Sequence, residues 1–235
     1  MNTQTSSPEI VRVTNVRKTY HDNGVPVDAL RGINLTVSPG DFSVIAGPSG
    51  SGKTTLLNII GTLDKPTEGN VFLDGEDVAS KTRRQLANIR LRKIGFVFQA
   101  YNLNPVLSAL ENVEFTMMLR GIDAGERKRK GLALLEELGI RELANKRPNE
   151  MSGGQQQRVA IARAISNDPR LVLADEPTAN LDSETAVKLL QLMEKLNHED
   201  GITFVFSSHD PQVIERAHRL LILKDGQIVT DKKNE

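Results

Sequence analysis

Hydrophobic and polar positions alternate along the first part of the chain with the period of two that is typical of half-buried strands. The alternation predicts strands over residues 10–13, 33–37 and 42–46. Turn-forming pairs separate them, among them Asn23-Gly24 and Pro39-Gly40. The chain is therefore expected to begin with three strands, the third of which leads into the segment that follows it.

Later apolar runs lack this alternation and are typical of central strands that are buried on both faces. They lie at residues 171–174 and 202–206, and residues 94–99 have strand composition as well. Between residues 109 and 165 the apolar spacing takes the period of a helix, which predicts a helical insertion at about residues 100–168. The pattern as a whole predicts an α/β fold.

Two hairpins complete the pattern. One is indicated around residues 69–75, and the last is expected over residues 220–229, where Asp225-Gly226 would form the turn. Residues 1–8 are small and polar, without the apolar core of a signal peptide, and are expected to form a flexible tail before one domain at residues 9–235. No stretch approaches the roughly 20 apolar residues that span a bilayer.

The strand at residues 42–46 leads into a segment that fits the phosphate-binding pattern G-x-x-x-x-G-K-[S/T]. In such a loop, backbone N–H groups surround phosphates, the lysine adds positive charge and the hydroxyl reaches Mg²⁺. The apolar run after Lys53 reads as a buried helix, and this strand–loop–helix context favours the motif over a plain Gly/Ser turn. The candidate ATP-binding residues here are Gly47, Pro48, Ser49, Gly50, Ser51, Gly52, Lys53, Thr54 and Thr55, with Thr54 also a candidate Mg²⁺ ligand.

An acidic pair ends the apolar run at residues 171–174. Asp175 at the end of such a strand is a candidate ligand of Mg²⁺, and Glu176 is a candidate for polarising the water that attacks the terminal phosphate. The alternative is a solvated acidic pair before Pro177, but a phosphate loop requires a carboxylate near its metal.

A second glycine-rich segment precedes a stretch rich in helix formers. Ser152 is a plausible N-cap, and Gly153 and Gly154 would expose backbone donors at the helix start. Together with Gln155 these residues predict a second anion site without a lysine. A plain capped helix is the alternative interpretation.

Composition restricts the partners of the chain. The 30 Lys and Arg residues balance the 30 Asp and Glu residues, so no global field attracts nucleic acid or anionic lipid. Cysteine is absent, which excludes disulfides, iron–sulfur clusters and thiolate zinc sites. The basic cluster at residues 127–130 has no interleaved aromatic residues and is expected to be a solvated helix face, so no nucleic-acid partner is expected.

The order of these segments resembles the ATP-binding subunits of ABC transporters over nearly the whole chain. The resemblance implies a P-loop NTPase fold with a RecA-like parallel core sheet, an N-terminal antiparallel β-subdomain and an inserted helical subdomain. It also implies a head-to-tail homodimer that hydrolyses two ATP molecules with Mg²⁺, each held by the phosphate loop of one subunit and Ser152, Gly153, Gly154 and Gln155 of the other. The segments that carry the resemblance are residues 47–54, Gln99, and residues 151–155, 171–176, 180–182 and 208–210.

Four more residues receive roles from the resemblance alone. Tyr20 would stack on adenine, the alternative being a surface tyrosine at a strand end. Gln99 would contact Mg²⁺ or the attacking water, and His209 would contact the terminal phosphate. Asp182 would lie at the dimer interface.

The resemblance also implies a membrane partner. Residues 99–107, from Gln99 to Leu107, would receive a short helix of an integral membrane permease, which would hold the protein at the cytoplasmic face of the inner (plasma) membrane. Residues 61–67 and 152–158 look most like the group that drives lipoprotein release and macrolide export. The alternatives are a soluble ABC-type ATPase acting on nucleic acid or the ribosome, and a regulatory ATPase that gates a cell-wall hydrolase.

Overall fold

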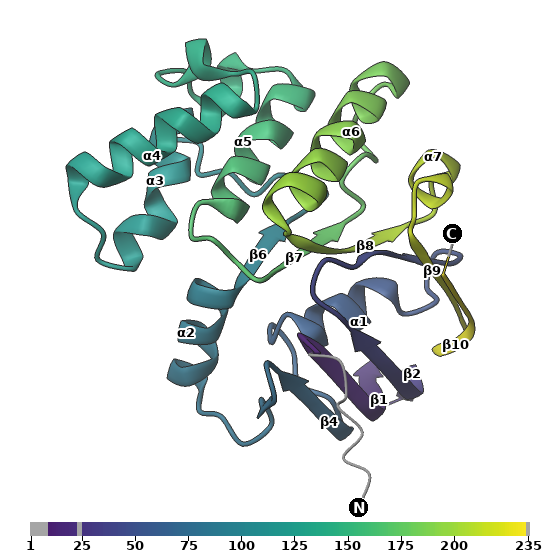
Figure 1. Cartoon of the computed structure of the whole chain (residues 1–235). Coiled ribbons are helices and arrows are strands. Elements are labelled where there is room, and N and C mark those ends of the chain that lie inside the picture. The colour runs from purple at the N-terminus through teal and green to yellow at the C-terminus, as the bar shows by residue number, and fades with distance from the viewer. Residues whose placement is uncertain (1–8, 23–24, 234–235) are drawn as a thin grey trace, which may run out of the picture. The chain divides into compact units, whose positions relative to one another are not determined.

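The computed structural model describes residues 9–22 and 25–233, which fall into two compact units (Figure 1). Unit 1 is formed by Met1–Leu86 together with Thr203–Glu235, and unit 2 by Ala87–Ile202. The predicted tail at residues 1–8 and the predicted turn at Asn23-Gly24 lie outside the described residues.

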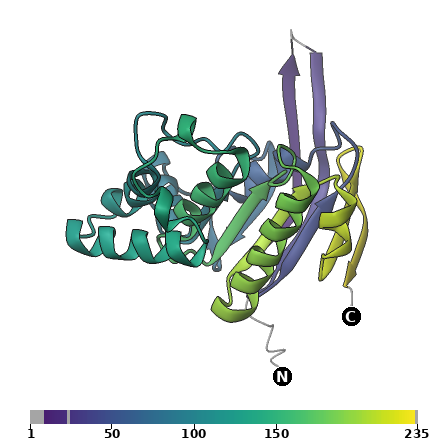
Figure 2. The same ribbon diagram turned by 90° about the horizontal axis from the view of Figure 1, so that it is seen from above.

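Unit 1 contains an antiparallel sheet with the strand order β2-β1-β4-β5. Its strands are β1 (Val11–Asp22), β2 (Val25–Val37), β4 (Glu68–Leu73) and β5 (Glu76–Asp77). The predicted lengths of the first two strands were wrong, because β1 and β2 continue as a long ribbon (Figure 2) whose far end is exposed, including Val25 and Val27. Backbone pairing extends the ribbon beyond the residues that face the core.

Unit 1 also contains strands of the core sheet. Strand β3 (Phe42–Ala46) is buried along its whole length and pairs in parallel with β8 (Thr203–Ser208) and β9 (Arg219–Lys224). Helix α1 (Lys53–Ile60) follows β3, and the five-residue helix α7 (Pro211–Glu215) follows β8. The rings of Phe42 and Phe206 lie 4.6 Å apart between neighbouring strands, at the centre of this core.

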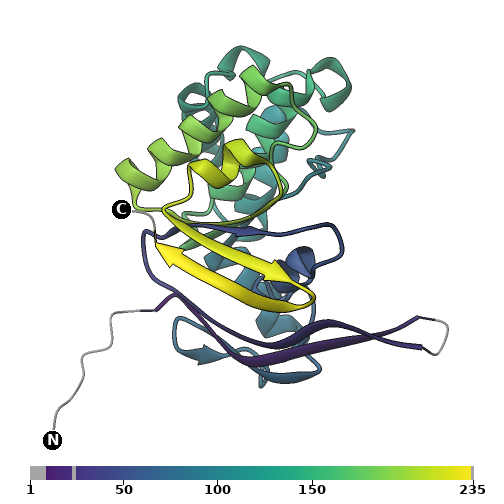
Figure 3. The same cartoon turned by 90° about the vertical axis from the view of Figure 1, so that its right-hand side faces the viewer.

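The predicted C-terminal hairpin is confirmed. Strand β10 (Gln227–Lys233) pairs with β9 in antiparallel fashion (Figure 3). Asp225 and Gly226 join them with φ angles of 49° and 76°, the positive values that a two-residue type I′ turn requires.

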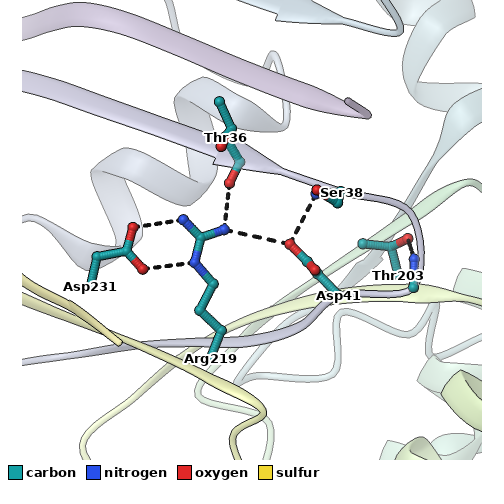
Figure 4. A network of polar contacts seen from close by, with 7 residues as sticks. Thr36, Ser38, Asp41, Thr203, Arg219 and Asp231 are labelled. Carbon is teal, nitrogen blue, oxygen red and sulfur yellow. Dashed lines mark hydrogen bonds and ion pairs between the residues drawn. The ribbon is translucent and has the colours of Figure 1, made fainter. Parts of the chain in front are cut away.

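Arg219 of β9 links strand β10 to strand β2 (Figure 4). Its guanidinium donates two hydrogen bonds of 2.7 Å to the Asp231 carboxylate and one of 2.6 Å to the carbonyl oxygen of Thr36. The Asp41 carboxylate lies 3.5 Å away and accepts a hydrogen bond from the backbone N–H of Ser38. The bonds from Arg219 lower the pKa of Asp231 and raise that of Arg219, so both charges are stabilised in the folded protein.

Unit 2 contains two parallel strands, β6 (Ile94–Val97) and β7 (Leu171–Asp175), and most of the helices. Helices α3, α4 and α5 pack together (Figure 1), and α3 begins at Ala109 while α5 ends at Ile165, which confirms the helical spacing over residues 109–165. The helices are α2 (Arg83–Lys93), which begins in unit 1, α3 (Ala109–Leu119), α4 (Ala124–Glu137), α5 (Gly153–Ile165) and α6 (Ser183–Asp200), with short 3₁₀ turns at Arg141–Leu143 and Pro148–Glu150. Within the described ranges, no helix has both the length and the apolar character that crossing a membrane requires.

Candidate active site

The phosphate loop lies between β3 and α1 in unit 1, as the motif predicted. Lys53 is 8% exposed, and its Nζ donates hydrogen bonds to the carbonyl oxygens of Gly47 at 2.8 Å and Pro48 at 3.1 Å. Helix α1 has Gly52 as its N-cap, and no side chain caps its first N–H groups. Uncapped N–H groups beside a held lysine are the arrangement that favours an anion.

Two positions of this loop leave no room for a side chain and therefore require glycine. A Cβ atom at Gly47 would lie 2.1 Å from the carbonyl oxygen of Leu223, and one at Gly52 would lie 2.5 Å from that of Ala29. Gly52 also has a φ of 104°, a conformation that side chains disfavour. In the same loop, the buried hydroxyl of Ser51 has no hydrogen-bond partner among the described residues. The loop therefore packs tightly against β9 and β2 and fits a polar ligand.

Unit 1 also carries Tyr20 and His209. Tyr20 lies on β1 with 40% of its surface exposed, and the Thr55 hydroxyl of helix α1 hydrogen-bonds to its phenol oxygen. His209 is exposed and directly follows β8. The next residue, Asp210, caps α7 by accepting a hydrogen bond from the backbone N–H of Gln212 at 2.9 Å. The structure thus brings Tyr20 to the start of the helix that follows the phosphate loop.

In unit 2, the acidic pair follows the predicted strand. Asp175 is the last residue of β7, and Glu176 comes next with a φ of 46°. A left-handed backbone at a residue other than glycine costs about 1 kcal/mol or more and is concentrated at functional sites. The local conformation is therefore consistent with a functional role for Glu176.

Gln99 lies in a loop, so the prediction that it ends a strand over residues 94–99 was wrong. Strand β6 stops at Val97, because the chain turns after Phe98, where the backbone N–H of Tyr101 bonds to the Phe98 carbonyl at 3.1 Å. The side chain of Asn180 donates a hydrogen bond of 2.8 Å to the carbonyl oxygen of Gln99. This bond joins Gln99 to the segment that carries Asp182.

The second glycine-rich segment starts α5. Ser152 is its N-cap, as predicted: its hydroxyl accepts a hydrogen bond from the Gln155 N–H at 3.3 Å, and the Gln155 side chain accepts one from the Ser152 N–H at 2.9 Å. Side chains at the two glycines would clash. A Cβ atom at Gly153 would lie 2.7 Å from the Tyr101 hydroxyl, and one at Gly154 would lie 2.4 Å from the Thr185 methyl group.

Asp182 caps helix α6. Its carboxylate accepts hydrogen bonds from the hydroxyl of Thr185 at 2.7 Å and from its backbone N–H at 3.0 Å. These two bonds, the hydroxyl first, lower the pKa of the exposed Asp182 carboxyl below its usual range. Thr185 therefore contacts Asp182 through its polar atoms and the position of Gly154 through its methyl group.

Sequence reasoning missed the residues that brace the loop after Gln99. Arg163 of α5 donates hydrogen bonds to the carbonyl oxygens of Asn102 at 2.5 Å and Tyr101 at 2.9 Å, and these two residues have φ angles of 50° and 58°. Asn112 of α3 exchanges hydrogen bonds with the backbone of Asn104. The signal that could have found this turn is Asn102, because asparagine tolerates a left-handed backbone.

The candidate Mg²⁺ ligands have suitable chemistry. Thr54, Asp175 and Gln99 offer a hydroxyl, a carboxylate and an amide oxygen, the oxygen donors that Mg²⁺ prefers. Among residues 9–22 and 25–233, no group of three His, Cys, Asp or Glu side chains could hold a metal by itself. Mg²⁺ is usually bound through one or two protein ligands together with substrate phosphates and water.

Comparison with known proteins assigns the family. A sequence profile of the ABC transporter family matches residues 30–179, more than half of the chain. The chain belongs to the ABC transporter family. This confirms the predicted fold class and the predicted activity, that of an ATP-hydrolysing nucleotide-binding subunit.

Relatives of this ABC transporter subunit include two proteins of the predicted group. The lipoprotein-releasing system ATP-binding protein LolD of Anaeromyxobacter dehalogenans is 47% identical over 222 residues, which cover 94% of this chain and 93% of that protein. The macrolide export ATP-binding/permease protein MacB of Syntrophobacter fumaroxidans is 49% identical over 223 residues. That match covers 94% of this chain but only 31% of MacB.

Among solved structures, the ATP-binding cassette MJ0796, a protein of Methanocaldococcus jannaschii, has the same fold. Its dimeric structure in a post-hydrolysis state with ADP and Pi bound has a TM-score of 0.89 and 47% sequence identity. The alignment covers 95% of this chain and 98% of that chain.

Proposed function

We propose that two copies of this ABC ATPase close head to tail around two ATP molecules and that this cycle drives a membrane permease. Each ATP would be held by the phosphate loop of one subunit and by residues 152–155 of the other. One observation carries the proposal: the cassette MJ0796, of nearly equal length and 47% identical, is dimeric with ADP and Pi bound. Residues 152–155, which we predict to form a second anion site without a lysine, would complete such a pocket from the partner.

Unit 1 supplies the groups that bind the nucleotide. The N–H groups of the loop from Gly47 to Gly52 and the ammonium of Lys53 bind the phosphates, Thr54 and Thr55 contact them, and Tyr20 stacks on the base. His209 contacts the terminal phosphate. These roles are supported by the uncapped start of α1 and by the contact between Thr55 and Tyr20.

Unit 2 supplies the groups that act on the attacking water. The Glu176 carboxylate orients the water and accepts its proton, and Gln99 contacts the same water. Asp175 and Thr54 would hold Mg²⁺, which neutralises charge on the phosphates when it is bound. Asp182 lies at the interface between the subunits in this arrangement.

The permease would dock on residues 99–107. This loop is held by side chains of α3 and α5, so a force on it reaches the helix that begins with residues 152–155. MacB is an ATP-binding protein and a permease in one, which supports a permease as the partner of this shorter chain. The complex would place this subunit peripherally at the cytoplasmic face of the inner membrane.

The variant Glu176→Gln tests the proposal. It should bind ATP, lower phosphate release about 100- to 10,000-fold as the loss of a general base does, and accumulate as a dimer with ATP on size-exclusion chromatography. Glu184→Gln is the matched control, because Glu184 is an exposed carboxylate paired with Lys188 on α6. Unchanged phosphate release in Glu176→Gln, or a strictly monomeric ATP-bound sample, would refute the proposal.

A further inference from the structure

The phenol of Tyr20 is fixed at its polar end. Its hydroxyl donates a hydrogen bond of 2.7 Å to Oδ2 of Asp64, a residue 44 positions further along the chain in the turn after α1. The backbone N–H of Lys65 donates a hydrogen bond of 2.7 Å to the other carboxylate oxygen. Tyr20 therefore reaches from β1 to a carboxylate that the local backbone already holds in place.

Lys18 completes this cluster of Lys18, Tyr20 and Asp64. Its Nζ donates hydrogen bonds of 2.8 Å to Oδ1 of Asp64 and of 2.8 Å to the carbonyl oxygen of Lys65. The same ammonium lies 4.7 Å from the centre of the Tyr20 ring. The Lys18 side chain is only 12% exposed, so the ion pair is better shielded from solvent than a typical surface pair.

The turn that carries Asp64 is itself tied to β1. The backbone N–H of Thr67 bonds to the Arg17 carbonyl at 2.8 Å, and the backbone N–H of Thr19 bonds to the Thr67 hydroxyl at 3.0 Å. These two hydrogen bonds join Thr67 to β1 on either side of Lys18. The ring of Tyr20 has little freedom to leave its rotamer, although 40% of the residue is exposed.

We infer that Asp64 and Lys18 are positioning residues that lock the Tyr20 ring as the stacking platform for the nucleotide base. Lys18 takes one face of the ring, so the base stacks on the other. A platform fixed before binding loses little side-chain entropy when the base arrives, which is how preorganisation improves affinity. This inference rests on the proposed function, in which Tyr20 binds the base of ATP.

Two variants test the positioning. Tyr20→Phe keeps the ring but loses the hydroxyl, and Asp64→Ala removes the carboxylate that orients it. Each should raise the KM for ATP roughly 3- to 10-fold, the range expected when one side chain must be ordered on binding, with kcat changed less than about twofold. Glu76→Gln is the matched control, because Glu76 pairs with Lys81 at 2.8 Å elsewhere in unit 1, and it should retain the original KM.

A ligand without a base separates positioning from general damage to the fold. Inorganic tripolyphosphate carries the phosphates alone, so its inhibition constant against ATP hydrolysis should be the same in Tyr20→Phe, Asp64→Ala and the parent protein. An equal weakening of tripolyphosphate and ATP would overturn the inference. Tyr20→Ala distinguishes the positioning of the ring from the stacking role of Tyr20 itself. If it weakens ATP binding while Tyr20→Phe and Asp64→Ala do not, positioning is refuted and the platform remains; if it has no effect, the role of Tyr20 itself fails.

A spectroscopic measurement reports on the cluster without nucleotide. The chain has two tyrosines and no tryptophan, so Tyr101→Phe leaves Tyr20 as the only absorbing phenol. Burial and then the bond to Asp64 raise the pKa of the Tyr20 phenol. In the Tyr101→Phe background, Asp64→Ala should therefore shift the ultraviolet titration of Tyr20 to lower pH. An unchanged titration would show that Asp64 does not hold the phenol and would overturn the inference.

Discussion

The hydroxyl of Tyr101 lies where a side chain at Gly153 would begin, 2.7 Å from the position of a Cβ atom. Tyr101 belongs to the loop after Gln99, and Gly153 is the first residue of α5. The requirement for glycine at this position therefore comes in part from packing inside unit 2, independently of any nucleotide.

Gly153→Ala should destabilise the protein by about 1 kcal/mol, the low end of the range for overpacking, because the hydroxyl that the methyl group meets is the end of a side chain that can shift. Adding Tyr101→Phe should recover most of this loss, because the nearest ring carbon would still be 3.7 Å from the new methyl group. Urea denaturation of the two single variants and the double variant measures the effect. A double variant that is as unstable as Gly153→Ala alone would contradict the packing explanation.

Sharing of sites between subunits predicts complementation. Lys53→Ala and Ser152→Arg should each be inactive as homodimers, since one removes the charge of the phosphate loop and the other fills the second anion segment. Mixed together, they form heterodimers in which one site keeps both intact halves. If subunits pair at random, half of the dimers are heterodimers. Because each heterodimer has one intact site of two, about a quarter of the parent ATPase rate should return. Mixing that restores no activity, with heterodimers verified by a tag on one subunit, would count against sharing.

The ion pair between Arg219 and Asp231 should make the free energy of unfolding depend on pH in the acidic range. Its hydrogen bonds lower the pKa of Asp231 in the folded state, so this stabilisation is present above the unfolded pKa of about 4 and is lost as pH falls through the lower folded value. The Asp231 side chain is 44% exposed, and solvent screening limits the gain at pH 7 to about 0.5–1 kcal/mol. Asp231→Asn should lose this amount at pH 7 and lose progressively less below about pH 4. Denaturation at several pH values checks this, and a difference that grows in acid would refute it.

Arg163→Lys should loosen the loop after Gln99. A lysine cannot hold the carbonyl oxygens of both Tyr101 and Asn102 in the geometry of a guanidinium, and their left-handed backbones lose this support. Amide hydrogen exchange in residues 100–107 should become faster, while β3 and α1 keep their protection. Arg129→Lys on the exposed face of α4 is the control and should leave the pattern unchanged.

Local patterns predicted the parts of the fold that short-range chemistry determines. The phosphate loop between β3 and α1, the N-cap at Ser152 and the turn at Asp225-Gly226 each depend on neighbouring residues, and all three are present. The helices α2 and α6 were not predicted. In α2 a high density of basic residues obscures the few apolar positions, of which Leu86 and Ile89 are buried.

Contacts between distant segments were beyond the reach of the sequence pattern. Nothing near Tyr20 indicates that Asp64 will accept its hydrogen bond, and nothing near Gly154 indicates that Thr185 will pack against it. Such contacts arise when the chain folds back on itself. The roles of the candidate site residues and the extent of the helical insertion at residues 100–168 remain predictions for the experiments above.

The two carbonyl bonds of Lys53 have a consequence for how ATP is recognised. Because Gly47 and Pro48 already accept two of the three ammonium protons, at 2.8 and 3.1 Å, an arriving phosphate meets a cation that is held in place and has one proton left to donate. Binding then requires little reordering of this side chain, so its entropic penalty should be lighter than for a lysine recruited from solvent.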